Sequence, residues 1–256
     1  SIFAQATSIG TSSPGGIYIW DIPTTATEIR FGNRPVFTVN GKAIIGVPIS
    51  QEPGEAAIDF RLENRSKKEI FRVKKKNYTE QRITLADTKM VSPPTKELDR
   101  IRKESAAQKA VYASFTPQID LSPGFIMPLE GRKTSLYGHR RFFNDVPRSP
   151  HSGLDIAAPT GTPIVAPGPG RVALRGDFYF NGKTILLDHG QGLITMYCHM
   201  SEYMVEEGEF IDQGQMLGLV GSTGRSTGPH LHWSVSLNNF RIDPLEFLPA
   251  VNQALK

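Results

Sequence analysis

Apolar and polar residues alternate along the first third of the chain with the period of β-strands. Strict alternation occurs in residues 57–63, AIDFRLE, and a period of two is the signature of a half-buried strand. Residues 36–49, VFTVNGKAIIGVPI, place Asn40 and Gly41 between two β-rich runs. Both residue types tolerate the positive φ of a tight hairpin. We therefore predict a small β-sandwich over residues 15–90.

The pattern changes after residue 90. Residues 91–116 begin with a Pro-Pro pair and continue with good helix formers, KELDRIRKESAAQKAVYAS. We predict a helix from Lys96 to about Ser114 with Thr95 as its N-cap, in a helical linker. The positions expected to face inward are Leu98, Ile101 and Tyr112.

Residues 117–256 return to short β-like runs separated by Gly and Pro, such as KTILLDHGQGLITMYCHM. Strands do not alternate with helices in this region, so a parallel sheet is not expected. The chain is therefore predicted to be mainly β, with an N-terminal β-sandwich, a helical linker and a C-terminal antiparallel β domain.

Composition and charge narrow the function classes. The chain has 256 residues, 39% of them hydrophobic, a single cysteine and a formal net charge of +4. Residues 1–116 hold 18 Lys and Arg against 12 Asp and Glu, and the remaining residues hold 11 against 13. Much of the excess lies in residues 61–76, RLENRSKKEIFRVKKK, which either faces an anionic polymer or forms a solvated hairpin surface. This run lacks the interleaved aromatics of a single-strand platform, so nucleic acid is not expected as a partner.

Two features concern localisation. No stretch approaches the roughly 18 to 20 apolar residues that span a bilayer, so no transmembrane segment is expected. The opening residues SIFAQATS contain Ala4-Gln5-Ala6, a pattern like the end of a signal peptide. We expect residues 1–14 to be disordered or a signal-peptide remnant.

The histidines of the C-terminal region suggest a metal site. His151 and Asp155 lie four residues apart in HSGLDIAAP, and His230 and His232 lie two apart in HLHW. Both offsets put the two side chains on one face of an extended segment. Neutral imidazole and carboxylate are common zinc ligands, and a catalytic zinc keeps three protein ligands. Together, His151, Asp155 and one of the two later histidines would supply that set, whereas either pair alone is common by chance on exposed strands. His199, in TMYCHMS, is a further candidate.

The sequence does not support two other protease chemistries. Cys198 precedes His199 directly, but successive side chains in a strand point to opposite faces, so the thiol and the imidazole cannot face each other and a Cys-His protease is excluded. No histidine is followed by glutamate, which excludes the H-E-x-x-H type of zinc protease.

Five motifs together carry a family resemblance. They are HSGLDI, GTPIVAPGPGRV, YCHMS, GQMLGLVGSTGRSTGPHLHW and DPLEFL. In this order, over roughly residues 122–248, the chain resembles the lysostaphin/LytM-type zinc endopeptidases of peptidoglycan. The resemblance implies an antiparallel β fold with an open groove and a Zn2+ cofactor. It assigns the metal to His151, Asp155 and His232, and catalysis to His199 and His230. The pattern gives no role to His139 and His189, which we expect to be structural. It departs from the family at Cys198 and Met200, which we expect to point away from the site.

The resemblance also implies a substrate and a location. An N-terminal β domain before the catalytic domain is similar to the Gram-negative exported members. We therefore expect an exported, periplasmic or cell-envelope enzyme that cleaves the D-alanyl to diaminopimelate cross-link of peptidoglycan. Glycine bridges are the alternative substrate, and non-enzymatic activation of cell-wall amidases is the alternative function. Family members are often latent, so residues 1–116 are expected to make an autoinhibitory contact with the catalytic groove.

Overall fold

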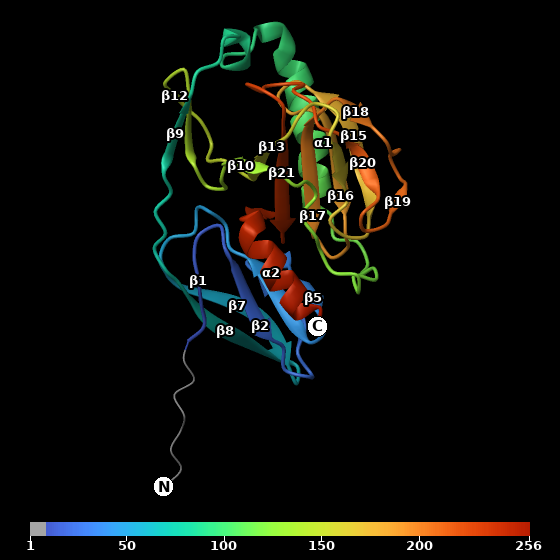
Figure 1. Ribbon diagram of the computed structural model, residues 1–256. Helices are drawn as coiled ribbons and strands as arrows, with labels where there is room; N and C mark the ends of the chain where they lie inside the picture. The colour runs from blue at the N-terminus through green and yellow to red at the C-terminus, as the bar shows by residue number, and fades with distance from the viewer. Residues whose placement is uncertain (1–8) are drawn as a thin grey trace.

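The computed structural model describes residues 9–256 and is built mainly from strands, as predicted (Figure 1). The N-terminal part, residues 11–73, is a sandwich of two sheets. One sheet has the order β1-β8-β7-β3-β4 and the other the order β2-β6-β5. The strands are β1 (Thr11–Ser12), β2 (Ile17–Asp21), β3 (Thr27–Phe31), β4 (Arg34–Pro35), β5 (Phe37–Val39), β6 (Lys42–Gly46), β7 (Gly54–Leu62) and β8 (Arg65–Val73).

The alternating pattern of the sequence accounts for this sandwich. Ile58 and Phe60 of β7 are buried between the sheets, against Phe71 of β8. The predicted hairpin joins β5 to β6, with φ of 48° at Asn40 and 72° at Gly41. Of the segment expected to be disordered, residues 1–8 lie outside the described residues, whereas β1 pairs with β8.

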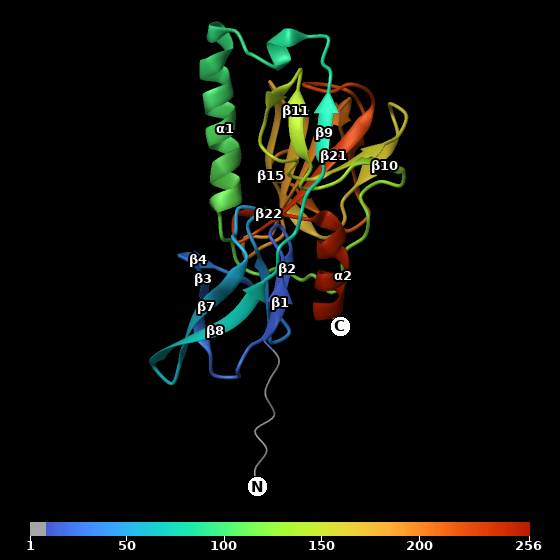
Figure 2. The same cartoon turned by 90° about the vertical axis from the view of Figure 1, so that its left-hand side faces the viewer.

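The chain then leaves the sandwich earlier than predicted. Strand β9 (Glu80–Ile83) pairs in parallel with β11 (Arg140–Phe143), whose other neighbour is β12 (Val146–Pro147). Two short 3-10 turns, η1 (Thr88–Met90) and η2 (Thr95–Glu97), follow. Figure 2 shows this segment running up the side of the molecule from β8 to the top of α1. Residues 80–90, expected in the sandwich, therefore lie with the C-terminal part.

Helix α1 (Leu98–Ala113) confirms the predicted helix but begins later. The Thr95 side chain does not cap it, because Thr95 lies in η2 and α1 starts three residues on. Leu98 is 36% exposed rather than buried. Tyr112 is buried and packs on Met196 and Cys198, so α1 covers one face of the main sheet and is more than a linker.

The C-terminal part contains an eight-stranded antiparallel sheet with the order β10-β13-β21-β17-β16-β15-β19, and β22 pairs with β21. A smaller sheet has the order β14-β20-β18. The elements are β10 (Arg132–Ser135), β13 (Leu154–Ala157), β14 (Pro163–Val165), β15 (Gly170–Phe178), β16 (Gly182–Asp188), β17 (Ile194–Met200), β18 (Glu202–Tyr203), β19 (Phe210–Ile211), β20 (Met216–Leu219), β21 (His230–Leu237), β22 (Phe240–Ile242) and α2 (Pro244–Ala254).

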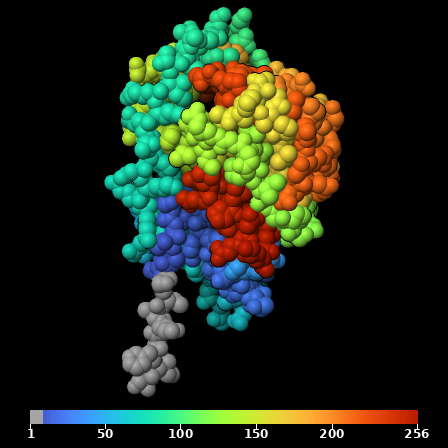
Figure 3. Space-filling view, viewed as in Figure 1, coloured from blue at the N-terminus to red at the C-terminus, as the bar shows by residue number. Residues whose placement is uncertain are grey.

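The sandwich and the C-terminal part share a hydrophobic core. Phe37 and Ile44 of the sandwich belong to the same buried cluster as Trp233 and Phe247. The Asn238 side chain also bonds both backbone groups of Gly46, at 2.7 and 3.0 Å. Figure 3 shows α2, in red, lying against the blue surface of the N-terminal strands. Within residues 9–256, no helix is both long enough and apolar enough to cross a membrane.

Candidate metal centre

Two neighbouring strands position the histidine and aspartate motifs. Strands β13 and β21 are antiparallel partners in the main sheet, and their register sets Asp155 opposite His232. His151 lies in the loop just before β13. Gly153 allows this loop to approach β21, because a Cβ there would lie 2.3 Å from the Trp233 carbonyl oxygen and 2.9 Å from His232 Nε2. The glycine of the HSG motif is therefore required by close packing.

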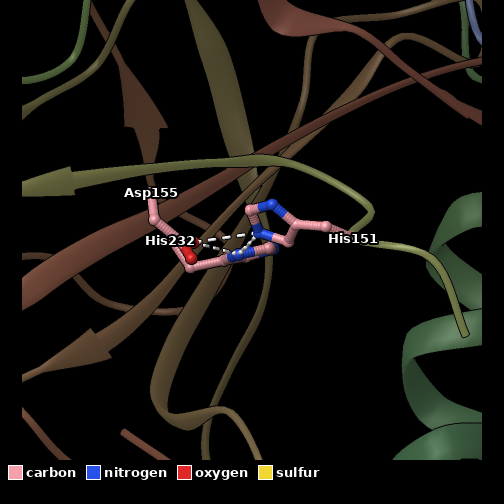
Figure 4. A group of neighbouring side chains, drawn as sticks. All are labelled: His151, Asp155 and His232. Carbon is pink, nitrogen blue, oxygen red and sulfur yellow. Dashed lines mark hydrogen bonds and ion pairs between the residues drawn. The ribbon is translucent and has the colours of Figure 1, made fainter. Parts of the chain in front are cut away.

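Three ligand atoms face one another at this point (Figure 4). His151 Nε2 lies 3.0 Å from Asp155 Oδ1 and 3.0 Å from His232 Nδ1. His232 Nδ1 lies 2.8 Å from the same carboxylate oxygen. All three residues are at least 92% buried. The structure thus brings together the three residues that the resemblance assigned to the metal.

The outward-facing nitrogens fix which atoms carry protons. His151 Nδ1 lies 2.7 Å from the Leu136 carbonyl oxygen, which can only accept, so Nδ1 carries the proton and Nε2 a lone pair. His232 Nε2 lies 2.8 Å from Ser234 Oγ. When His232 donates there, its Nδ1 also presents a lone pair. Burial lowers the pKa of His151 and of His232, which favours these neutral forms.

Asp155 remains ionised in the same place. Burial by itself raises its pKa, but interactions with His151 and His232 outweigh burial and hold the pKa of Asp155 well below its ordinary value. When instead both rings hold their protons on the outward-facing nitrogens, two imidazole lone pairs and the Asp155 carboxylate converge on one point. A cation bound at this point would stabilise that arrangement.

The donor set fits a metal ion of the zinc type. Tetrahedral ligands at about 2.0–2.1 Å from an ion are separated by roughly 3.3 Å from one another. The observed separations of 2.8–3.0 Å are close to this value. Two nitrogens and one oxygen would leave a fourth position open, as in catalytic sites.

A second layer of residues orients the three converging side chains, and no motif in the sequence pointed to it. Arg141 of β11 donates to the other oxygen of Asp155 at 2.6 Å and to Ser135 Oγ at 3.0 Å. Gln81 of β9 accepts from Ser135 Oγ at 2.8 Å and from Arg141 Nε at 3.0 Å. The only sequence signal was an arginine ahead of the HSGLD motif. Nothing local distinguishes Arg141 from Arg140, which pairs with a half-exposed glutamate on the surface.

His199 and His230 flank the three ligands with their rings 4.7 Å apart. His199 Nδ1 donates to the Thr223 carbonyl at 2.7 Å, and His230 Nδ1 donates to the Gly228 carbonyl at 2.8 Å. In the neutral form each Nε2 therefore carries a lone pair, and His230 Nε2 lies 4.0 Å from Asp155 Oδ1. Burial, followed by the rings of His230 and His232, lowers the pKa of His199 to about 3.

The backbone at His199 corrects one expectation. His199 has a φ of 63° at an irregularity between β16 and β17, which interrupts the regular alternation of side chains along the strand. Cys198 lies opposite His232 in register and packs on Tyr112 of α1. The expectation that Cys198 points away from the site is therefore wrong, because it shares the sheet face of His232. Burial raises the pKa of its thiol, which disfavours a reactive thiolate.

The two remaining histidines lie outside the ligand set. His139 Nδ1 is 3.3 Å from Ser135 Oγ, which in turn lies 3.1 Å from His151 Nδ1. His189 is completely buried and bonds the Pro169 carbonyl and Thr195 Oγ, at 2.5 and 2.7 Å. Neither contacts the three converging ligand atoms.

The centre lies in a cavity of about 360 Å³, whose lining includes Gln108 and Tyr112 of α1 and, from the segment before it, Ile83 and Leu85. We call residues 84–91 the strap. Leu85 and Val91 of the strap are buried with Phe143. The Asn144 side chain bonds both backbone groups of Leu85, at 2.8 and 3.1 Å. The resemblance implied an open groove, and here Leu85 of the strap lines one side of it.

Comparisons with known proteins agree with this geometry. The model of Peptidase family M23 matches residues 149–244. A solved structure from Pseudomonas aeruginosa that is assigned to peptidase M23 is 38% identical, with a TM-score of 0.75, and the match covers 93% of this chain and 95% of that one. The DD-carboxypeptidase/endopeptidase Mpg of Neisseria meningitidis is 38% identical over 41% of this chain. The peptidoglycan DD-endopeptidase ShyA of Vibrio cholerae is 40% identical over 34% of this chain.

The matched segments cover only 25% of Mpg and 20% of ShyA. The Pseudomonas structure, in contrast, matches along nearly its whole length. The likeness therefore includes the N-terminal sandwich as well as the metal centre, and the chain belongs to peptidase family M23.

Proposed function

We propose that this chain is a zinc-dependent endopeptidase that hydrolyses the peptide cross-links of peptidoglycan. The observation that carries the proposal is the convergence of His151 Nε2, His232 Nδ1 and Asp155 Oδ1 within 3.0 Å of one another. The relatives Mpg and ShyA are named as peptidases of the DD type. We therefore favour the D-alanyl to diaminopimelate bond. An enzyme acting on this polymer works outside the cytoplasm, which supports an exported, periplasmic location.

Zinc, when bound, supplies Lewis acidity that polarises the scissile carbonyl and makes a water molecule acidic. The protein's own contribution lies in the two flanking histidines. His199 and His230 each present Nε2 to the cavity, because a backbone carbonyl holds the proton on Nδ1. One of these nitrogens accepts a proton from the attacking water, and the resulting N–H then donates to the developing oxyanion or to the leaving amine. Burial keeps His199 neutral at physiological pH, as a proton acceptor must be.

The structure supports an enzyme rather than a non-enzymatic activator of amidases. An activator has no need of a complete donor set, whereas here all three donors and both flanking histidines meet in one cavity. A glycine-bridge endopeptidase uses the same metal chemistry, so the substrate must be decided by the products.

Digestion of purified peptidoglycan by the full chain tests this function. Zinc-loaded protein should release fragments whose masses correspond to cleavage between D-alanine and diaminopimelate. A strong chelator should abolish the release, and added zinc should restore it. Full activity in metal-free protein would contradict the proposed metal chemistry, and glycine-terminated products would identify the alternative substrate.

We also propose that the strap keeps the enzyme latent. Leu85 of the strap lines the cavity that holds the centre, and it is buried together with Val91 and Phe143. A polymeric substrate must move the strap to reach His199 and His230. The expected autoinhibitory contact is then made by the strap rather than by the sandwich itself.

A further inference from the structure

The cavity is lined by four arginines and a single carboxylate. Arg141 pairs with that carboxylate, Asp155. The other arginines of the lining are Arg148, Arg225 and Arg241, and within residues 9–256 no carboxylate oxygen lies within 4.0 Å of their guanidinium nitrogens. A divalent ion would add further positive charge. A pocket of one sign concentrates ligands of the opposite sign.

The Arg225 guanidinium lies over two aromatic rings. Its guanidinium carbon lies 4.6 Å from the ring centre of Phe143 and 4.5 Å from that of Phe180. Its hydrogen bond to protein is long, 3.4 Å from Nη1 to the Met90 carbonyl oxygen of the strap. Burial, together with the charges of Arg148 and Arg141, lowers the pKa of Arg225 to about 10, so it stays charged at neutral pH. A stacked guanidinium with free edges is suited to a planar ligand.

Arg148 is also incompletely satisfied. One of its terminal nitrogens donates to the Val91 carbonyl of the strap, and its Nε is buried without a hydrogen-bond partner. Both arginines are partly buried and meet only neutral carbonyls, whereas a charged acceptor would bind them about twice as strongly. Arg148 and Arg225 thus contact the carbonyls of two consecutive strap residues, Val91 and Met90. An anion in the position of these carbonyls would bind the two arginines more strongly.

We propose that Arg148 and Arg225 form a carboxylate-binding subsite beside the metal centre, occupied by the Met90 and Val91 carbonyls when the strap is closed. This inference rests on the proposed function and specifies its substrate. In the cross-link between D-alanine and diaminopimelate, the carbon that bears the scissile nitrogen also bears a free carboxylate. The interior of a glycine bridge has no charged group. The subsite therefore selects the first substrate, and its carboxylate displaces the strap carbonyls.

Two synthetic peptides test the subsite. Both contain the D-alanyl to diaminopimelate bond, and they differ only in whether the carbon next to the scissile nitrogen carries a carboxylate or a carboxamide. Zinc-loaded full-length protein should cleave the carboxylate peptide with a kcat/KM roughly 10- to 100-fold higher, the range for hydrogen bonds to a charged group. Arg148→Gln and Arg225→Gln should each remove most of this preference.

Matched variants separate recognition from packing. Arg225→Lys keeps the charge without the planar fork and should retain part of the preference. Arg132→Gln, at an exposed position of β10, should leave both rates unchanged. Equal cleavage of the two peptides by the unaltered protein would overturn the subsite. An equal loss on both peptides in the Arg225→Gln protein would also overturn it, because that is the effect of disturbed packing.

Failure of the proposed function would look different, since neither peptide would then be cleaved. In that case calorimetric titration with the corresponding product peptides still decides the subsite. Tighter binding of the carboxylate form, lost in Arg225→Gln, supports it, and equal affinities refute it.

Discussion

Weakening the strap should release activity, and Leu85→Ala is the most specific way to do so. Leu85 is 8% exposed and packs with Val91 and Phe143 at the edge of the cavity. Truncating a buried leucine to alanine costs about 2 kcal/mol at a site that can partly relax. Because the strap lies outside the main core, most of this cost falls on the closed strap. The open population should then rise by up to roughly 30-fold.

The assay is the initial rate of cleavage of a short soluble cross-linked peptide by full-length protein. Zinc content and thermal midpoint are recorded alongside, so that loss of metal or global unfolding is detected. Leu245→Ala is the matched control, since Leu245 is 37% exposed on α2 and its truncation leaves the strap intact. An unchanged rate in Leu85→Ala, with zinc retained, would refute the idea that the strap closes the site.

A point substitution tests the role of the strap more specifically than a deletion of residues 1–116 does. The deletion would remove Phe37 and Ile44 from the core that they share with Trp233. It would also remove Gln81, which bonds the arginine that contacts Asp155. Loss of activity in such a fragment would report damage to the core or the centre rather than the role of the strap.

Three further predictions follow from the histidines and the loop before β13. His199→Ala should keep near-stoichiometric zinc while turnover falls by about 10² to 10⁴, as for loss of a positioned acid/base group; zinc loss in this variant would contradict its assignment. Burial lowers the pKa of His189 to about 4, so between pH 7 and 5 the unfolded chain binds a proton that the native protein does not. The free energy of unfolding, measured in urea, should therefore fall by about 2 kcal/mol between pH 7 and 5 because of His189. His189→Gln should not show this contribution to the pH dependence. Gly153→Ala should lower zinc affinity and thermal stability together, because its Cβ would meet the Trp233 carbonyl at 2.3 Å; normal values of both would show that the loop relaxes.

Features that depend on local patterns were predictable from the sequence. Alternation marks β7, Asn40 and Gly41 mark a hairpin, and the β-sandwich followed from them. The paired motifs around His151 and His232 identified residues that the structure brings together, since each pair needs only an extended backbone to share a face.

Features that depend on long-range contacts were not predictable. The strap, and the Gln81 to Arg141 contact, arise because β9 pairs with β11, sixty residues further along the chain. No local signal predicts that pairing. The left-handed backbone at His199 likewise accompanies an irregular β16–β17 register. The expected orientations of Cys198 and His199 had assumed a regular alternation of side chains along this strand. The start of α1 was misplaced because Thr95 has the chemistry of an N-cap but lies in a preceding 3-10 turn.

The most direct test of the metal centre compares His230→Ala with His232→Ala, by zinc content from elemental analysis and by peptidoglycan cleavage. His232 contributes one of the three converging ligand atoms, so its variant should lose both metal and activity. His230 Nε2 lies 4.0 Å from Asp155 Oδ1 and faces the cavity. Its variant should keep near-stoichiometric zinc and lose about 10² to 10⁴ in turnover. Loss of zinc in His230→Ala together with its retention in His232→Ala would contradict the account.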